Sequence, residues 1–397
     1  MRIAYITSFI TPAFSKKFCE NKSYSVSATF KSTAIARAIL KAGHEIEIFS
    51  PGITSCNKFI KAHTEKLIYK EGKVIVHYPN IISYHKCSFI NSLLLHTFLK
   101  KQLNKHHYDI LLYYNITLDA ALNLQAFKKQ IRILEYEDNI FNKALKGRHN
   151  EFEWLKAKLF GFVMKRTDAA IIAGKNMLKD FKSLPKLQIP GAINEDVIEN
   201  INRSLKPLKL DYPVKLLLAG GLHYSKGPDL IIKALYNVDI PCEIHFYGNG
   251  TLEKETNEMI KCLPKQHKVI IHGSLSHKEI IRIMSEETHI LINSTRSMGV
   301  DEQSEGYPFK MLEYAATGIP IISSRIGKLD DEFNKLVNFY ETENPNEIAN
   351  VIKCVINDYE NCVKSAHMLQ SHVLEEYSIP NISRKIGLFI EGISKIR

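Results

Sequence analysis

The sequence has no run of 18 or more apolar residues, which excludes a membrane-spanning helix. Its seven cysteines are scattered singly, without a C-x-x-C pair or zinc-ligand spacing, so we expect neither a disulfide framework nor a structural zinc site. The first residues lack the apolar core and cleavage site of a signal peptide, and a cytoplasmic protein is therefore expected. No G-x-G-x-x-G follows the first predicted strand, residues 1–9, which disfavours a dinucleotide site there.

What the chain does have is the composition of a globular protein, with 45% hydrophobic and 24% charged residues over a length of 397. That length is too great for one ordinary core and favours two domains. The formal net charge of +11 predicts an anionic partner. No recognised nucleic-acid module is present, so we expect no nucleic acid. An anionic membrane face and a phosphate-bearing donor or acceptor both remain as partners.

Strand and helix patterns alternate along the chain. Residues 1–9 form an apolar strand, residues 34–40 have a helical period, and residues 45–50 alternate as a second strand. Together they make one βαβ unit, which predicts a parallel sheet.

A second series of this kind begins after a polar, basic segment at residues 202–213, which contains two prolines and is typical of a linker. The first strand of the new series is predicted at residues 215–219. The whole pattern predicts an α/β fold with two doubly wound, Rossmann-like domains. The predicted division is a first domain at residues 1–200, a linker at 201–213 and a second domain at 214–380.

The stretch from Glu305 to Ser324 has the pattern of a loop, a short helix, a stop and a buried strand. Pro308 suits a first helical position, and Gly318 suits a left-handed C-cap. Glu313 follows Glu305 by about 12 Å along a helix axis and within about 80° around it. Such a pair, with helix-start N–H groups between, suits a ligand with hydroxyls at both ends and phosphate in the middle, such as a nucleotide-sugar. On spacing alone, dipole compensation by the first glutamate and solvation of the second are the alternative.

A glycine turn follows the strand at residues 215–219. Gly220 and Gly221 are followed by Lys226 and then by a predicted helix, so backbone N–H groups and a cation converge as in a phosphate cradle. The Gly-Lys-Ser/Thr order of a Walker A loop is absent.

Acidic residues cluster after the strand predicted at residues 131–136. Ligands of α/β sheets bind at the carboxyl ends of strands, and Asp138, with Glu137 behind it, is our candidate there. A plain N-cap for a helix at residues 142–145 is the alternative.

The predicted helix at residues 89–103 has an apolar face and is followed by a basic end. An amphipathic basic helix can lie on an anionic membrane. The alternative is a helix that packs on the sheet and leaves its basic end in solvent.

The 305–324 stretch resembles the E-x7-E signature of retaining glycosyltransferases of family 4, which have the GT-B fold. The matching residues are Glu305, Gly306, Glu313, Ala316, Gly318 and Pro320. A branch with Pro-x-Lys-x-x-Glu-Tyr fits still better, through Pro308, Lys310, Glu313 and Tyr314.

The resemblance implies a role for each candidate residue. Glu313 would bind the ribose hydroxyls, Glu305 the sugar hydroxyls, and Lys226 the diphosphate. The implied catalytic residues are Glu305, Lys226 and Asp138. The implied donor-binding residues are Glu313, Gly306, Tyr307 and Phe309 with their backbone N–H groups, Gly220, Gly221, the G-x-G turn of Gly248 and Gly250, and Leu275 beside the base.

The sequence departs from the family pattern in two places. Gly221 stands where an arginine is usual, and we expect Arg296 or Lys310 to supply the missing cation. Val26 and Ser27 stand where a Gly-Gly turn is usual on the acceptor side.

The resemblance implies a GT-B protein whose two domains face a central cleft, with a last helix at residues 381–397 returning to the first domain. We expect a retaining hexosyltransferase that uses a UDP- or GDP-sugar and a glycan or lipid-linked acceptor in cell-surface polysaccharide biosynthesis. It would be cytoplasmic and peripheral on the inner membrane face. No D-x-D stands in a suitable place, so we expect no metal and no cofactor besides the co-substrate. A degenerate sugar- or membrane-binding protein and a nucleotide-sugar epimerase are the alternatives.

Overall fold

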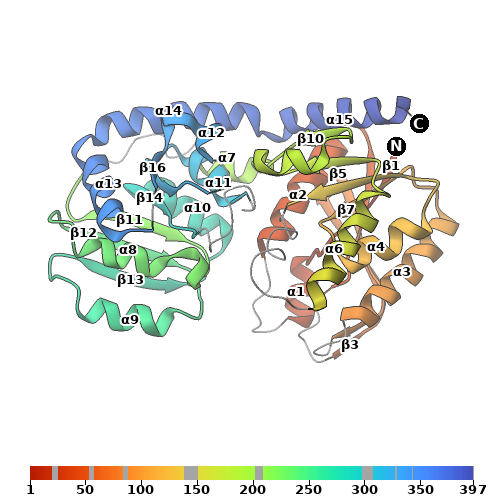
Figure 1. Ribbon diagram of the computed structural model, residues 1–397, viewed down its shortest axis with the longest axis horizontal. Helices are drawn as coiled ribbons and strands as arrows, with labels where there is room; N and C mark the ends of the chain where they lie inside the picture. Colours follow the sequence, from red (N-terminus) through yellow and green to blue (C-terminus); the bar gives the residue numbers. More distant parts are fainter. Residues whose placement is uncertain are drawn as a thin grey trace. The chain divides into compact units, whose positions relative to one another are not determined.

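The chain divides into two compact units, which are described separately below. A computed structural model describes residues 1–19, 26–52, 58–83, 88–137, 151–201, 209–296, 307–326, 329–341 and 343–396. Unit 1 comprises Met1–Ala192 and Ile379–Arg397, and unit 2 comprises Ile193–Ser378 (Figure 1).

Unit 1 is built on an eight-stranded sheet, within the described part of the chain, of order β10-β9-β8-β7-β1-β2-β5-β4. All neighbours pair in parallel except β4, which is antiparallel to β5 at the edge. The strands are β1 (Arg2–Ile6), β2 (Glu45–Phe49), β4 (His63–Tyr69), β5 (Gly72–Tyr78), β7 (Ile110–Tyr114), β8 (Ile131–Tyr136), β9 (Ala169–Ile172) and β10 (Lys186–Gln188). Two short strands, β3 (Lys58–Ile60) and β6 (Ile81–Ser83), pair separately with each other.

Helices cover this sheet because its central strands are apolar on both faces, as buried parallel strands require. They are α1 (Pro12–Phe18), α2 (Val26–Lys41), α3 (Ser88–Lys105), α4 (Leu118–Ala126), α6 (Glu151–Met164), the 3-10 helix η1 (Lys175–Phe181) and α15 (Ile379–Ile396). Helix α15 contacts α2, and Ile382, Ile386 and Ile390 recur on its buried face at helical spacing.

Unit 2 has a six-stranded parallel sheet among its described residues, of order β13-β12-β11-β14-β15-β16. The strands are β11 (Val214–Ala219), β12 (Cys242–Tyr247), β13 (Lys268–Gly273), β14 (Ile290–Asn293), β15 (Ile321–Ser324) and β16 (Asn338–Tyr340). The strand order reverses between β11 and β14. In open α/β sheets, ligands bind outside the carboxyl ends of the strands at such a switch point.

The helices of unit 2 alternate with these strands. They are α7 (Glu195–Ile201), η2 (Tyr224–Lys226), α8 (Pro228–Leu235), α9 (Glu253–Lys261), α10 (His277–Glu286), α11 (Lys310–Thr317), α12 (Leu329–Phe333), η4 (Asn334–Leu336), α13 (Pro345–Asn357) and α14 (Tyr359–Glu376). No helix among the described residues is both long and apolar enough to cross a membrane. The prediction of an α/β fold with two doubly wound sheets is confirmed.

The boundaries differ in detail from those predicted. Unit 1 stops at Ala192 rather than at residue 200, because α7 contacts α10 and α11 of unit 2. Most of the predicted linker, residues 202–208, lies outside the described residues. Leu210, at its end, packs against the core of unit 2.

Candidate active site

Two backbone turns touch each other at the carboxyl ends of β11 and β12. A Cβ atom on Gly248 would lie 2.0 Å from the carbonyl oxygen of Gly220, and one on Gly250 would lie 2.1 Å from that of Leu222. Gly220 and Gly248 also have φ values of 137° and 149°, where other residues are strained. The N–H of Leu222 donates to the carbonyl of Asn249 at 3.1 Å. Glycine is therefore required for these turns to pack side by side.

The Lys226 turn is held by the segment that follows β14. A Cβ on Gly227 would lie 2.3 Å from the carbonyl oxygen of Ser294, whose hydroxyl donates to the carbonyl of Lys226 at 2.7 Å. The N–H of Arg296 donates to the carbonyl of Ser225 at 2.9 Å. The switch point between β11 and β14 thus fixes the backbone of Lys226.

Arg296, one of the two residues predicted to supply the missing cation, forms ion pairs within unit 2. Its guanidinium donates to both carboxylate oxygens of Asp229 at 2.8 Å and to Glu343 at 3.0 Å, and lies 4.0 Å from the centre of the Tyr224 ring. Burial lowers the pKa of Arg296, but the hydrogen bonds and charge of Asp229 outweigh that effect and raise it. Arg296 fastens the Lys226 turn to the start of α8.

Lys310, unlike Arg296, has a side-chain nitrogen without a hydrogen-bond partner among the described residues. The residue as a whole is half-buried, but this Nζ atom is buried. Burial, and then the positive charge of Lys226, lower its pKa to about 7. The positive charge of Lys226 therefore reaches the ammonium group of Lys310.

Helix α11, which carries Lys310, is attached to the end of β11. The N–H of Ala219 donates to the Tyr314 hydroxyl at 2.9 Å, and Lys310 Nζ lies 5.8 Å from the centre of the Tyr314 ring. Burial raises the pKa of this hydroxyl above its usual range, so it stays protonated. The tyrosine of the Pro-x-Lys-x-x-Glu-Tyr pattern thus connects the helix to Ala219, the last residue of β11.

Glu313, one turn along α11, is paired with a residue that the sequence reasoning missed. His277 Nε2 donates to Glu313 Oε1 at 2.7 Å. His277 is the first residue of α10, whose start is fixed by a capping box between Ser276 and Glu279. Leu275, just before this cap, is exposed. Only the position of His277 after the Gly273–Leu275 turn pointed toward this pair.

Helix α11 begins later than predicted. Pro308 was expected at its first position, but the helix starts at Lys310, because the carbonyls of Pro308 and Phe309 accept short i+3 hydrogen bonds from Met311 and Leu312. The N–H of Phe309 forms no hydrogen bond with a described residue. Tyr307 is buried, which raises the pKa of its hydroxyl well above the usual range.

Three predicted residues, Glu305, Gly306 and Asp138, lie outside the described residues. The acidic cluster that precedes Asp138 turns inward within unit 1. Glu137 is buried and forms an ion pair with Lys31, and Glu135 is hydrogen-bonded to Tyr5. Burial raises the pKa of Glu135.

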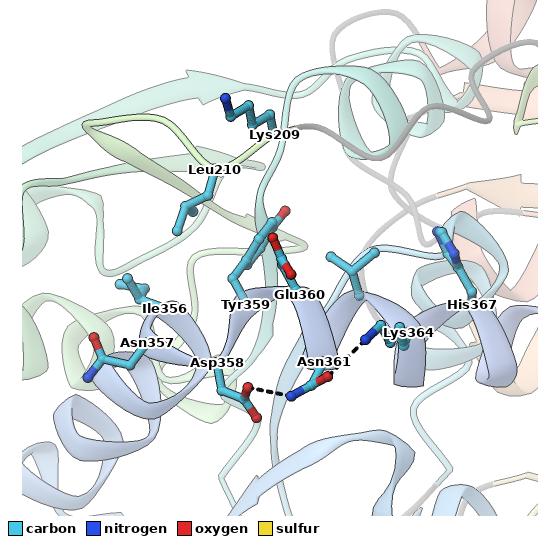
Figure 2. A pocket seen from close by; sticks show the side chains of 11 residues that line it. Lys209, Leu210, Ile356, Asn357, Asp358, Tyr359, Glu360, Asn361, Lys364 and His367 are labelled. Carbon is cyan, nitrogen blue, oxygen red and sulfur yellow. Dashed lines mark hydrogen bonds between the residues drawn. The ribbon is translucent and has the colours of Figure 1, made fainter.

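A separate pocket of about 850 Å³ lies where α13 meets α14. Figure 2 shows Asn361 between Asp358 and Lys364, with hydrogen bonds of 2.7 and 3.2 Å. None of the predicted site residues lines this pocket. Among the described residues there is also no group of three or more side chains that could hold a metal ion.

The fold is that of the GT-B glycosyltransferases. Sucrose-phosphate synthase from Thermosynechococcus elongatus superposes with a TM-score of 0.74 at 14% identity, over 100% of both chains. HepE from Anabaena, solved with UDP-glucose, gives 0.66 at 13% identity over 100% of both chains. A glycosyltransferase from Rickettsia africae gives 0.68 at 14% identity, over 100% of this chain and 99% of that one.

Residues 201–370, which form most of unit 2, match the family model of glycosyl transferases group 1. No curated relative matches the chain by sequence. The GT-B architecture that the resemblance implied is confirmed, whereas membership of family 4 and the E-x7-E roles stay predictions.

Proposed function

We propose that the protein is a retaining glycosyltransferase that moves a sugar from a nucleotide-sugar donor to a glycan or lipid-linked acceptor. The observation that carries this proposal is the lysine pair at the switch point of unit 2. The positive charge of Lys226 acts on the buried Lys310, and Lys226 follows the glycine turn at the end of β11. A buried cation without a hydrogen-bond partner among the described residues is costly unless a ligand compensates it.

The donor's diphosphate is the ligand that compensates this charge. A diphosphate diester carries two negative charges, and two ammonium groups match them. During sugar transfer the negative charge on the departing nucleotide increases, and preorganised cations stabilise that transition state. Lys310 thereby replaces the arginine that the resemblance places at Gly221.

The nucleoside lies, in this proposal, at the Glu313 end of α11. A carboxylate oriented by His277 at 2.7 Å is a suitable acceptor for two ribose hydroxyls. Gly273–Leu275 would hold the base with backbone groups. Glu305 would hold the sugar hydroxyls, and Asp138 stays a predicted catalytic residue.

We further propose a uridine donor and a reaction independent of divalent metal. HepE, which shares the fold, was solved with UDP-glucose. The two lysines would neutralise the diphosphate, which is the work of the metal in enzymes that use one. Synthesis of a cell-surface polysaccharide is the pathway class that fits a basic protein with such a donor.

A thermal-shift panel of UDP-, GDP- and ADP-sugars tests the proposal. A UDP-sugar should raise the Tm of the wild type and of Glu258→Ala, an exposed glutamate on α9, but not of Glu313→Ala. Nucleotide release should persist in excess EDTA, and the product should keep the donor's anomeric configuration by NMR. If no nucleotide-sugar shifts Tm and Glu313→Ala behaves like wild type, the proposal is wrong.

One observation favours a second candidate. Gly221 provides no cation of its own, as expected for a degenerate GT-B protein that binds sugar without chemistry. Binding of a nucleotide-sugar without nucleotide release, in the presence of every acceptor tried, would support that candidate.

A further inference from the structure

The net charge of +11 is distributed very unequally between the two units. Unit 1 contains 34 lysines and arginines against 15 aspartates and glutamates, a formal charge of +19. Unit 2 contains 19 against 27, a formal charge of −8. Unit 1 therefore carries the excess positive charge that can attract a large anionic partner, in addition to the diphosphate proposed for unit 2.

Within unit 1, one continuous stretch has no acidic residue at all. Residues 72–108 contain five lysines and neither aspartate nor glutamate. Helix α3 lies inside this stretch, and α1 is also free of acidic residues while exposing Lys16 and Lys17. Glu65, the acid of the neighbouring edge strand, turns toward Thr11 and is hydrogen-bonded to it.

Helix α3 has two different faces. Its inner face is anchored in the core of unit 1 through Leu95 and Leu99. Its first turns expose Phe89 by 56%, Ile90 by 44% and Leu93 by 40%. Helix α3 (Figure 1) thus packs on unit 1, as the second alternative predicts, and it also exposes apolar and basic side chains, while its binding to a membrane stays a prediction.

Strand β3 extends this surface. Phe59 is 56% exposed between the exposed Lys58 and Lys61. Phe59 pairs with Ile82 of β6, and the Asn91 side chain of α3 bonds the N–H and the carbonyl of Ile82 at 2.8 and 3.0 Å.

Strand β6 thus links β3 to α3, and we call the exposed apolar and basic residues at these two elements the α3–β3 face. It consists of Phe59, Phe89, Ile90 and Leu93 with Lys58, Lys61, Lys100 and Lys101.

We propose that the α3–β3 face docks unit 1 onto an anionic lipid bilayer. Exposed phenylalanine, isoleucine and leucine side chains enter the boundary between headgroups and acyl chains, while the surrounding lysines remain at the anionic headgroups. A nucleic acid or a soluble polyanion would attract the lysines but would leave Ile90 and Leu93 in water. The combination of clustered apolar side chains with unopposed lysines is what selects a bilayer.

Vesicle co-sedimentation of the full chain, without any donor, tests this inference independently of the proposed function. We expect binding to phosphatidylcholine vesicles with about 30% phosphatidylglycerol and at least about tenfold weaker binding to phosphatidylcholine alone. The double variant Phe89→Ser, Leu93→Ser should lose at least about fivefold in affinity. Lys100→Glu with Lys101→Glu should lose a similar factor and make the remaining binding less sensitive to salt.

Leu388→Ser is the matched control, since Leu388 is 59% exposed on α15 of the same unit but lies outside the α3–β3 face. It should bind as the wild type does. All variants replace exposed side chains, so an unchanged Tm should accompany them. Wild-type binding to neither vesicle, equal binding by the Phe89/Leu93 variant, or preference for a soluble polynucleotide over anionic vesicles would overturn the inference.

Discussion

Units 1 and 2 share one architecture, a largely parallel sheet covered by helices, yet they differ in the sign of their charge and in how they treat buried ions. Unit 1, at +19, pairs its buried lysine: Lys31 bonds Glu137. Unit 2, at −8, leaves the Nζ of Lys310 buried without a hydrogen-bond partner among the described residues. The comparison teaches that the sheet and its helices depend on apolar patterning, whereas surface charge and uncompensated buried charge report on ligands.

The largest expected effect is on the rate of nucleotide release, and it concerns the lysines of unit 2. Lys226→Met should lower nucleotide release from a sugar donor by about 100- to 1,000-fold, because one preorganised charge at a leaving group is worth that much. Steady-state kinetics provides the measurement. Lys261→Met, which removes an exposed lysine of α9, is the control and should leave the rate unchanged. Equal rates for both variants would contradict the role of Lys226.

Replacement of Arg296 tests whether this residue stabilises the fold or binds the donor. Arg296→Met should lower the free energy of unfolding by about 3 kcal/mol, since it leaves the buried carboxylate of Asp229 uncompensated. Urea denaturation measures this change. Arg325→Met removes an exposed pair with Glu341 and should cost less than about 1 kcal/mol. A stable Arg296→Met protein that cannot bind donor would show that Arg296, and not Lys310, binds the anion.

Glycines of the two units should respond in opposite directions. Gly248→Ala should cost about 1–3 kcal/mol of stability, because its Cβ would overlap the carbonyl of Gly220 at 2.0 Å. Gly161→Ala, in α6 of unit 1, should stabilise by about 0.5–1 kcal/mol, because that helical position has open space. Thermal or urea unfolding of the two variants compares them. A neutral Gly248→Ala would mean that the two turns do not touch.

The smallest effect is a pH dependence of donor affinity. Because the pKa of Lys310 is lowered to about 7, the free protein loses this charge as pH rises through 7, and binding of a dianion must restore the proton. Donor affinity should therefore be constant below pH 7 and fall by up to about tenfold per pH unit above it.

Titration calorimetry at several pH values measures this slope. Lys310→Arg keeps its charge and should remove the slope while retaining affinity. Lys310→Met should remove the slope and lower the affinity at every pH. A wild-type affinity that is flat from pH 7 to 9 would exclude proton uptake by Lys310.

Local features of the fold could be predicted from the sequence, because they depend on neighbours in the chain. The strands, the glycine turns at Gly220 and Gly248, and the Gly318 C-cap follow from periodicity and backbone freedom. Tertiary partnerships could not be predicted in this way. Arg296 forms ion pairs with Asp229 and Glu343, which are remote in sequence, and no local pattern around Arg296 indicates them.

The same limit explains the missed His277, which meets Glu313 only after α10 and α11 pack together. It also explains the domain boundary, since α7 has the pattern of any amphipathic helix and is assigned to unit 2 by its contacts alone. The charge contrast between the units can be counted from the sequence once the domain boundary is known.

The lysine pair of unit 2, Lys226 and Lys310, holds a nucleotide diphosphate in the proposed function. Titration calorimetry at pH 7, with the UDP-sugar that gives the largest thermal shift, tests it most directly. The wild type should bind, and the Lys226→Met, Lys310→Met double variant should lose at least about 100-fold in affinity, since two charge-assisted contacts disappear. A double variant that binds the donor as tightly as the wild type would contradict the account.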